Sequence, residues 1–295
     1  MRDSSSVHVP VLANEVLQWL NPRPGQVFVD GTMGGGGHTR LLIERVRPGG
    51  EVIGVDRDPV AIVRAERELS GQPLRVAQAN FSEVPEVLAS AGVKRVHGIL
   101  LDLGLSSDQL TDSGRGFSFD ADGPLDLRFD PERGEPAWRL LERLGSEHLA
   151  NIIYQFGEER YSRRIAREIV QQRRQRPIRL ARELSELVRR CVPRSKNHAI
   201  DPATRTFQAL RIAVNDELKS LEVALRRLPD CLVPGGRFAI ISFHSLEDRR
   251  VKQAYRTDPR LQPLVRKPIR ATPEEVDQNA RSRSARLRVA ECLEC

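Results

Sequence analysis

The sequence predicts an α/β fold in which a mainly parallel sheet, covered by helices, is interrupted after its fourth strand by a helical insertion. Two observations support this prediction. Four short apolar runs alternate with helical patterns up to residue 102, and three of these runs end in a carboxylate. The alternation then stops for about a hundred residues and resumes with the helix expected at 208–228 and the strand after Pro234. Alternating strands and helices are typical of a parallel sheet, and a hundred residues are enough for a small domain.

The first half of the sheet follows from the order of apolar runs and turn residues. A helix is expected at 13–20, because its apolar residues have helical spacing and Asn21-Pro22 follows. Asp58-Pro59 predicts the capped start of another helix. The four strands are expected at 27–30, 51–56, 74–78 and 97–102.

The pattern breaks after residue 102. From Leu103 to about Pro136 there are many turn residues but no periodicity, which indicates a functional loop. Residues 137–192 predict three or four helices, one of them strongly basic. Its arginines indicate either a solvated face or an RNA-binding surface. The remaining expectations are a long helix at 208–228, a strand and a helix after Pro234, an exposed loop at 259–280 and an edge strand from Arg286.

These patterns divide the chain into an α/β domain in two parts, 1–105 and 208–295, and an inserted helical domain, 106–207. The net charge is +7, and only five of the 47 basic residues are lysine. Arginine suits phosphate and base edges, so the composition favours a polyanionic partner. No apolar run approaches membrane-spanning length, and scattered cysteines fit a reducing compartment, so a cytoplasmic protein is expected. The terminal pair Cys292 and Cys295 lacks a matching second pair, and no metal site is expected.

A glycine-rich turn joins the first strand to its helix. Five glycines lie within residues 31–37, where they let the backbone approach a nucleotide-like ligand. A P-loop fits poorly because His38-Thr39 stands where Lys-Ser/Thr is needed. The glycine spacing does not follow a dinucleotide-binding fingerprint either.

The carboxylates at the strand ends favour S-adenosylmethionine as the ligand. Asp30 suits a cationic sulfonium and would repel a pyrophosphate, while Asp56 is placed to accept ribose hydroxyls. Asp102 follows the fourth strand, where the sheet is expected to open towards a reaction centre. Each acid alone is more often a cap or a turn former, so the prediction depends on their combination.

Along nearly the whole chain, the sequence resembles the ribosomal small subunit methyltransferase H family, also called MraW. The motifs that carry the resemblance are long and occur in one order. They include Asp30-Gly-Thr-Met-Gly-Gly-Gly-Gly-His-Thr, Leu100-Leu-Asp-Leu-Gly-Leu-Ser-Ser-Asp-Gln-Leu, Arg115-Gly-Phe-Ser-Phe, Gly123-Pro-Leu-Asp-Leu-Arg, Pro202-Ala-Thr-Arg-Thr-Phe and Ile241-Ser-Phe-His-Ser-Leu-Glu-Asp-Arg.

The resemblance implies a Rossmann-like methyltransferase fold that uses S-adenosylmethionine. It implies methylation of the exocyclic N4 of a cytidine in 16S rRNA of the small ribosomal subunit, and a homodimer. It also implies an inserted domain that helps to build the substrate site. The cofactor contacts that it implies are Gly36, Gly37, His38, Asp56, Phe81, Asp102 and Gln109.

The chemistry of methyl transfer suggests further residues. Cytosine N4 is a weak nucleophile because its lone pair is conjugated into the ring, so an acceptor on the amino hydrogens would help. Asp102, with Ser106 nearby, is the candidate acceptor, and a pure cofactor ligand is the equal alternative for Asp102. Candidate substrate contacts are Arg115, Phe117, Phe119, Asp126, Arg128, Arg205, Phe243 and His244. Core packing for the phenylalanines, ion pairs for the arginines and helix capping for His244 are the structural alternatives.

Two rival functions make different predictions. A nicotinamide oxidoreductase would bind NADH and would show no affinity for S-adenosylhomocysteine. A non-catalytic RNA-binding protein of the same fold would bind RNA without transferring methyl groups.

Overall fold

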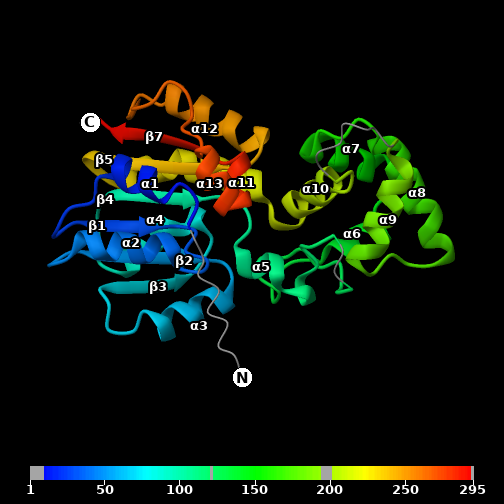
Figure 1. Ribbon diagram of the computed structural model, residues 1–295, viewed down its shortest axis with the longest axis horizontal. Helices are drawn as coiled ribbons and strands as arrows, with labels where there is room; N and C mark the ends of the chain where they lie inside the picture. The colour runs from blue at the N-terminus through cyan, green and yellow to red at the C-terminus, as the bar shows by residue number, and fades with distance from the viewer. Residues whose placement is uncertain (1–9, 120–121, 194–200, 294–295) are drawn as a thin grey trace. The chain divides into compact units, whose positions relative to one another are not determined.

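The computed structural model describes residues 10–119, 122–193 and 201–293 (Figure 1). The chain divides into two compact units. The first combines Met1–Ser106 with Leu218–Cys295, and the second is Ser107–Glu217. The second unit therefore runs ten residues beyond the expected insertion, 106–207, because α10 (Thr204–Asn215) packs on α7 (Ser146–Gly157). Cys295 of the terminal pair lies outside the described residues.

The first unit is built on one sheet that has seven strands among the described residues, in the order β3-β2-β1-β4-β5-β7-β6. Strands β1 to β5 are parallel to one another, and β7 is antiparallel to both β5 and β6. The predicted Rossmann-like α/β fold, interrupted after its fourth strand, is confirmed. The strands are β1 Val27–Asp30, β2 Glu51–Asp56, β3 Leu74–Gln78, β4 Val96–Asp102, β5 Leu232–Ser242, β6 Leu261–Pro263 and β7 Arg286–Cys292.

Helices cover both faces of this sheet because neighbouring strand residues point to opposite sides. Phe28, Val52 and Leu100 pack on one face with side chains of α1 and α2. Val29 and Ile99 pack on the other with α4, α11 and α12. The helices of this unit are α1 Ala13–Leu20, α2 Gly37–Val46, α3 Pro59–Glu68, α4 Val84–Ser90, α11 Glu217–Arg227, α12 Ser245–Thr257 and α13 Pro273–Gln278.

The sheet order places the ends of two strands at a switch point. From β1 the chain moves outward to β2 and β3, and then returns to β4 on the other side of β1. Ligands of open α/β sheets bind where the carboxyl ends of such strands diverge. The glycine-rich turn follows β1, and Asp102 ends β4, so both lie at this point.

The second unit is helical (Figure 1). The prediction of three or four helices at 137–192 is confirmed by four, α6 to α9. Between α5 and α6 the backbone is mostly irregular, as the sequence predicts. The helices are α5 Ser107–Thr111, α6 Ala137–Arg143, α7 Ser146–Gly157, α8 Ser162–Gln175, α9 Ala181–Cys191 and α10 Thr204–Asn215. Among the described residues of the chain, no helix is both long and apolar enough to span a bilayer.

Three expectations about secondary structure are wrong. The helix expected at 208–228 is broken at Asp216, whose φ of 50° lies in the left-handed region. The loop expected at 259–280 contains β6 and α13, which are too short for their periodicity to be recognised. Strand β7 is not an edge strand but lies between β5 and β6, because the three-residue β6 covers its outer side.

Candidate functional site

The glycine-rich turn is attached to the two strands that flank β1. Gly31 N–H donates to the carbonyl of Leu100 in β4, at 2.9 Å, and Met33 N–H donates to that of Val55 in β2, at 3.0 Å. The Thr32 hydroxyl accepts from the backbone N–H of Asp102, at 2.6 Å. The turn therefore has a fixed position relative to the ends of β2 and β4.

Two features explain the need for glycine in this turn. Gly36 precedes α2 with a φ of 76°, a conformation that L-residues rarely adopt. A Cβ on Gly31 would lie 2.5 Å from Leu101 Cδ2 and 3.3 Å from Phe81 Cβ. The turn thus packs directly on the ends of β4 and the segment after β3, which places Phe81 beside it.

The buried side chain of Asp30 stabilises the glycine-rich turn through hydrogen bonds. Its side chain is 1% exposed, and its two carboxylate oxygens accept from the Thr39 hydroxyl at 2.7 Å and from Thr32 N–H at 3.3 Å. A carboxylate enclosed in this way cannot face a ligand directly. Its negative charge can attract a cationic ligand only across the turn. This differs from the direct contact with a sulfonium that the sequence suggests.

Asp56 holds the turn from the end of β2. One carboxylate oxygen accepts from Gly34 N–H at 2.7 Å, and the other accepts from Asp58 N–H at 2.9 Å. Asp58 itself caps α3 by accepting from Val60 N–H, so the predicted cap is confirmed. Asp56 therefore links the glycine turn to the start of α3.

Asp102 and His38 meet at the opening of the sheet. Asp102 Oδ2 lies 3.8 Å from His38 Nε2, and both side chains are largely buried. Asp102 Oδ1 accepts no hydrogen bond from the described residues although it is buried. Buried carboxylate oxygens are normally satisfied, so this oxygen is suited to a donor or a cation on a ligand. The residues around the turn thus fit a ligand such as the one implied by the sequence.

Arg281, which the sequence gives no reason to select, completes the surroundings of Asp102. Its guanidinium donates to the carbonyl of Leu105, in the loop that follows β4. Burial raises the pKa of Asp102 to about 7, while the positive charge of Arg281 opposes this rise. Arg281 thus holds the loop after β4 and favours the ionised form of the neighbouring carboxylate.

The three strand-end carboxylates should make the free protein less stable as the pH rises. Burial raises the pKa of Asp30 and Asp56 to about 6, and that of Asp102 to about 7, from a usual 3.8. Between 3.8 and these values the folded protein binds more protons than the unfolded chain, so stability is highest at the acid end and falls as the pH rises to about 7. The loss from Asp30 alone is about 3 kcal/mol.

Urea unfolding of the free protein between pH 5 and pH 8 measures the part of this loss that occurs above pH 5. Carboxylates paired with arginine, such as Asp248 and Asp258, have lowered pKa values, so they change the stability only at lower pH. Asp102→Asn, whose amide does not titrate, should make the curve less steep between pH 5 and about pH 7. A stability that increases steadily over this range would contradict the expectation.

Two further predicted residues lie close to the turn or to the loop after β4. The Cβ of Ser106 is 3.4 Å from the position that a Cβ on Gly34 would take. The ring of Phe243, at the end of β5, lies 3.4 Å from the corresponding position on Gly104. Ser106 therefore borders the glycine turn, and Phe243 covers the loop after β4.

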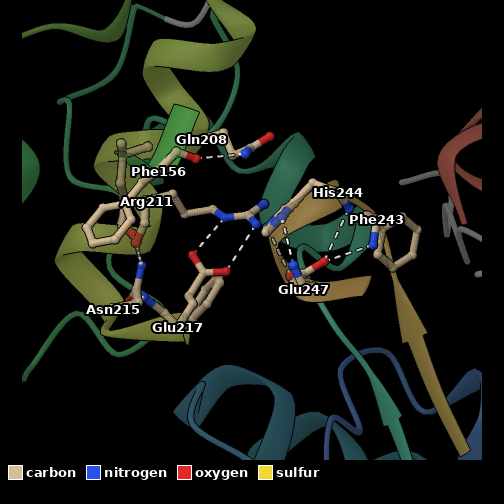
Figure 2. A network of polar contacts seen from close by, with 10 residues as sticks. Phe156, Gln208, Arg211, Asn215, Glu217, Phe243, His244 and Glu247 are labelled. Atoms are coloured by element: carbon tan, nitrogen blue, oxygen red, sulfur yellow. Dashed lines mark hydrogen bonds and ion pairs between the residues drawn. The ribbon is translucent and has the colours of Figure 1, made fainter. Parts of the chain in front are cut away.

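His244 caps α12 together with Glu247 (Figure 2). His244 Nδ1 accepts from Glu247 N–H at 3.4 Å, and its Nε2 lies 3.1 Å from Glu247 Oε1. The buried Glu247 also accepts from Phe243 N–H, at 2.8 Å. The predicted capping alternative for His244 is confirmed, and Glu247 fixes the backbone on which Phe243 stands.

In the second unit, the predicted substrate residues Arg115 and Phe117 are buried. The guanidinium of Arg115 donates to the carbonyls of Arg128 and Phe129. The ring of Phe117 stacks on that of Phe129, with centroids 5.9 Å apart. Both side chains therefore stabilise the irregular segment before α6, and a substrate contact for either stays a prediction.

The other predicted residues of this unit differ in exposure. Arg128 forms a two-point ion pair with Asp126, at 2.7 and 2.8 Å, which is the expected structural alternative. Arg205 is exposed on α10, and its guanidinium donates to the Glu158 carbonyl. Gln109 lies on α5. Phe119 packs edge-to-face on Phe207, with centroids 5.0 Å apart.

A second polar cluster ends α10 (Figure 2). Asn215 donates to the Leu127 carbonyl at 2.7 Å and accepts from Phe129 N–H at 2.8 Å. Arg211 pairs with Glu217, at 2.8 and 3.0 Å, across the break at Asp216. These bonds explain why the helix stops here, since Asn215 is needed to anchor the irregular segment.

Sequence reasoning missed Thr32, Thr39, Glu247 and Arg281. Thr32 and Thr39 lie within or next to the glycine motif, and hydroxyls near a buried carboxylate are a signal that could have been used. Arg281 lies in a stretch of alternating arginine and serine, where no pattern separates it from its neighbours. Within the described part of the chain, no cluster of three or more His, Cys, Asp or Glu side chains could hold a metal ion.

Comparison with known proteins agrees with this geometry. A model of the MraW methylase family matches residues 5–293. A protein named ribosomal RNA small subunit methyltransferase H from Rhodopirellula baltica is 51% identical over 298 residues, which cover 97% of this chain and 92% of that protein. A protein of the same name from Deinococcus radiodurans is 51% identical over 96% of this chain and 89% of that protein. Another, from Synechococcus elongatus, is 50% identical over 98% of this chain and 95% of that protein.

Proposed function

The chain belongs to the MraW methylase family, and from this premise we propose that it methylates the exocyclic N4 of a cytidine in 16S rRNA of the small ribosomal subunit. It is an enzyme, an rRNA methyltransferase that depends on S-adenosylmethionine. The structural observation that supports the proposal is the group of carboxylates around a glycine turn, with a buried oxygen of Asp102 left for a ligand.

S-adenosylmethionine, when bound, supplies a methyl group activated by a sulfonium. We propose that Asp56 accepts the ribose hydroxyls while it keeps Gly34 in place. The other residues proposed to hold the cofactor are Gly36, Gly37, His38, Phe81, Asp102 and Gln109. The negative charges of Asp30 and Asp102 would favour the cationic donor over the neutral thioether product, which helps the product to leave.

The enzyme must then make a weak nucleophile react. Asp102 is proposed to accept a hydrogen bond from the N4 amino group, which localises the nitrogen lone pair and stabilises the positive charge that develops on it. Ser106 would provide a second acceptor. The cytosine must leave its stack to reach the site, and Phe243 is proposed as the aromatic surface on which it rests. Holding the nitrogen in line with the methyl group, about 3 Å away, would supply much of the rate enhancement.

The product identifies the reaction. Small ribosomal subunits from a strain without the enzyme would be incubated with the protein and labelled S-adenosylmethionine, and the RNA would be digested to nucleosides. We expect N4-methylcytidine, identified by retention time and fragmentation. Label in 5-methylcytidine would overturn the N4 assignment. RNA binding without label would favour the non-catalytic rival, and NADH binding without S-adenosylhomocysteine binding would favour the oxidoreductase.

We also propose that the enzyme works in the cytoplasm, where its RNA substrate would be found, and that it forms a homodimer. The dimer is supported by the resemblance of the sequence to its family. Light scattering after size-exclusion chromatography tests this directly, and a mass near 33.2 kDa would show a monomer instead.

Arg281 should control the pH at which Asp102 becomes ionised. Arg281→Met removes the positive charge that lowers the pKa of Asp102, so that pKa should rise further. If Asp102 acts as a carboxylate, a rise of about one unit in this pKa should lower kcat at pH 7 about fivefold, and kcat should recover by about pH 9, because the acid limb of the profile moves to higher pH.

Two variants separate this effect from general damage. Arg281→Lys keeps the charge and should keep the pH profile, and Arg283→Met changes an exposed neighbour and should behave as wild type. A loss of kcat that is equal at every pH would show that Arg281 only supports the loop through the Leu105 carbonyl.

A further inference from the structure

Three arginines form a row on the outer face of α8. Arg163, Arg167 and Arg174 are exposed, whereas Ile165 and Ile169 on the opposite side are buried. With 100° per residue, the three arginines lie within about 40° of one another around the helix axis and span about 16 Å along it. We call them the α8 arginine row.

Within the described ranges, no carboxylate pairs with the positive charges of this row. No ion pair among the described residues includes Arg163, Arg167 or Arg174, and the Nε of Arg167 donates to the Arg163 carbonyl. Eight other arginines of the second unit have carboxylate partners. They are Arg128, Arg133, Arg143, Arg176, Arg179, Arg182, Arg189 and Arg211.

A groove of about 530 Å³ runs along the row where α8 faces the start of α7. Two arginines of the row and two glutamine amides line it, together with a hydroxyl, and its lining contains no carboxylate. The lining residues are Ser146, Arg167, Val170, Gln171, Arg174 and Gln175. Such a surface offers many hydrogen-bond donors and positive charge.

A groove in the first unit differs in that its lining includes carboxylates, which pair with two of its arginines. It lies between α11 and α12 and includes Arg250 and Arg260. Arg250 pairs with Glu222 at 2.7 Å, and Arg260 pairs with Asp258 at 2.6 Å. Both of these arginines are neutralised by acids of the same groove, in contrast to those of the α8 arginine row.

We propose that the α8 arginine row, which belongs to the second unit, binds the phosphate backbone of the RNA substrate. This inference rests on the proposed function. Guanidinium groups match phosphate oxygens in two-point hydrogen bonds, and contacts of this kind position RNA without reading its sequence. An acidic amphipathic peptide would need an apolar floor, and Val170 is the one apolar residue in the groove lining.

The test is a triple variant, Arg163→Gln with Arg167→Gln and Arg174→Gln, assayed on small ribosomal subunits from a strain without the enzyme. We expect KM for the subunit to rise about tenfold or more at roughly 0.1 M salt, with kcat and the affinity for S-adenosylhomocysteine unchanged. The plot of log(kcat/KM) against log salt concentration should become shallower by about 2, since each of three contacts to single-stranded RNA contributes about 0.7.

Two control variants make the result specific. Replacing the same three arginines with lysine keeps the charge, so the salt dependence should stay close to wild type. Replacing three exposed arginines of the first unit with glutamine removes the same total charge, and these residues are Arg23, Arg45 and Arg95. This second control should have a wild-type KM, and an equal rise in its KM would show a general effect of net charge. Unchanged thermal unfolding would show that the variants are folded.

The outcomes separate this inference from the proposed function. If the wild type methylates the subunits and the triple variant has the same KM and salt dependence, the inference about α8 is wrong and the function stands. If the wild type neither binds nor methylates them, the proposed function is wrong, and the inference with it. Loss of binding to anionic lipid vesicles, with methylation unchanged, would assign the row to a membrane surface and overturn the proposal.

Discussion

The Asp102→Asn variant is expected to lose at least about a hundredfold in kcat for methyl transfer while it remains folded. Asp102 carries a buried oxygen without a donor among the described residues, and it lies at the end of β4, next to the glycine turn. An amide of the same shape is a weaker acceptor and carries no charge. It therefore cannot stabilise the positive charge that develops on the acceptor nitrogen as the new bond forms.

Single-turnover transfer of labelled methyl groups, at saturating cofactor and RNA, measures this effect directly. Turnover that stays intact under these conditions, with a weaker affinity for the cofactor, would make Asp102 purely a cofactor ligand. Asp277→Asn, an exposed change of the same chemistry on α13, is the matched control and should leave kcat unchanged. The variant should also be more stable than the wild type near pH 8, because a buried charge has been removed.

The second large effect is expected from Asp56→Ala, in affinity and not in kcat. Asp56 holds Gly34 N–H at 2.7 Å and is proposed to accept the ribose hydroxyls. Hydrogen bonds to a charged group contribute about 1.5–3 kcal/mol each, so losing the contacts should weaken cofactor binding about a hundredfold. At saturating cofactor, kcat should remain within a few-fold of wild type, because Asp56 does not touch the acceptor nitrogen.

Titration calorimetry with S-adenosylhomocysteine gives this affinity without turnover. Asp56→Asn distinguishes the two functions of the side chain, because its amide oxygen can still accept from Gly34. An affinity close to wild type for Asp56→Asn would mean that the anchored turn matters and the charge does not. An unchanged affinity for Asp56→Ala would remove Asp56 from the cofactor site.

The sequence was sufficient for the parts of the fold that have local causes. Short apolar runs that end in Asp30, Asp56 and Asp102 predicted the strands and brought the acids to one edge, because carboxyl ends of parallel strands meet there. Asp58 before Pro59 predicted the cap of α3, because an N-cap depends only on the residues at the start of the helix. The roles of Asp102 and Ser106 and of the substrate residues stay predictions.

The features that were missed depend on contacts between distant segments. The helical pattern of apolar residues continues through Asp216. The local sequence therefore does not indicate that Asn215 binds the backbone of Leu127 and Phe129. The contact of Arg281 with the Leu105 carbonyl joins segments far apart in the chain, and its arginine neighbours have the same composition. Tertiary contacts decide such cases, and single-sequence patterns do not contain them.

The position of the insertion has a consequence for how the sheet assembles. Strands β1 to β4 lie within the first 102 residues, but β4 pairs Ile99 with Phe238 of β5, about 140 residues later. Closing a loop of this length costs about 2 kcal/mol more than closing a crossover of a dozen residues. The N-terminal four strands should therefore form first, and the addition of β5, β7 and β6 should limit the rate of folding. Until then β4 is an exposed apolar edge, which makes this half-sheet the state most prone to aggregation during synthesis.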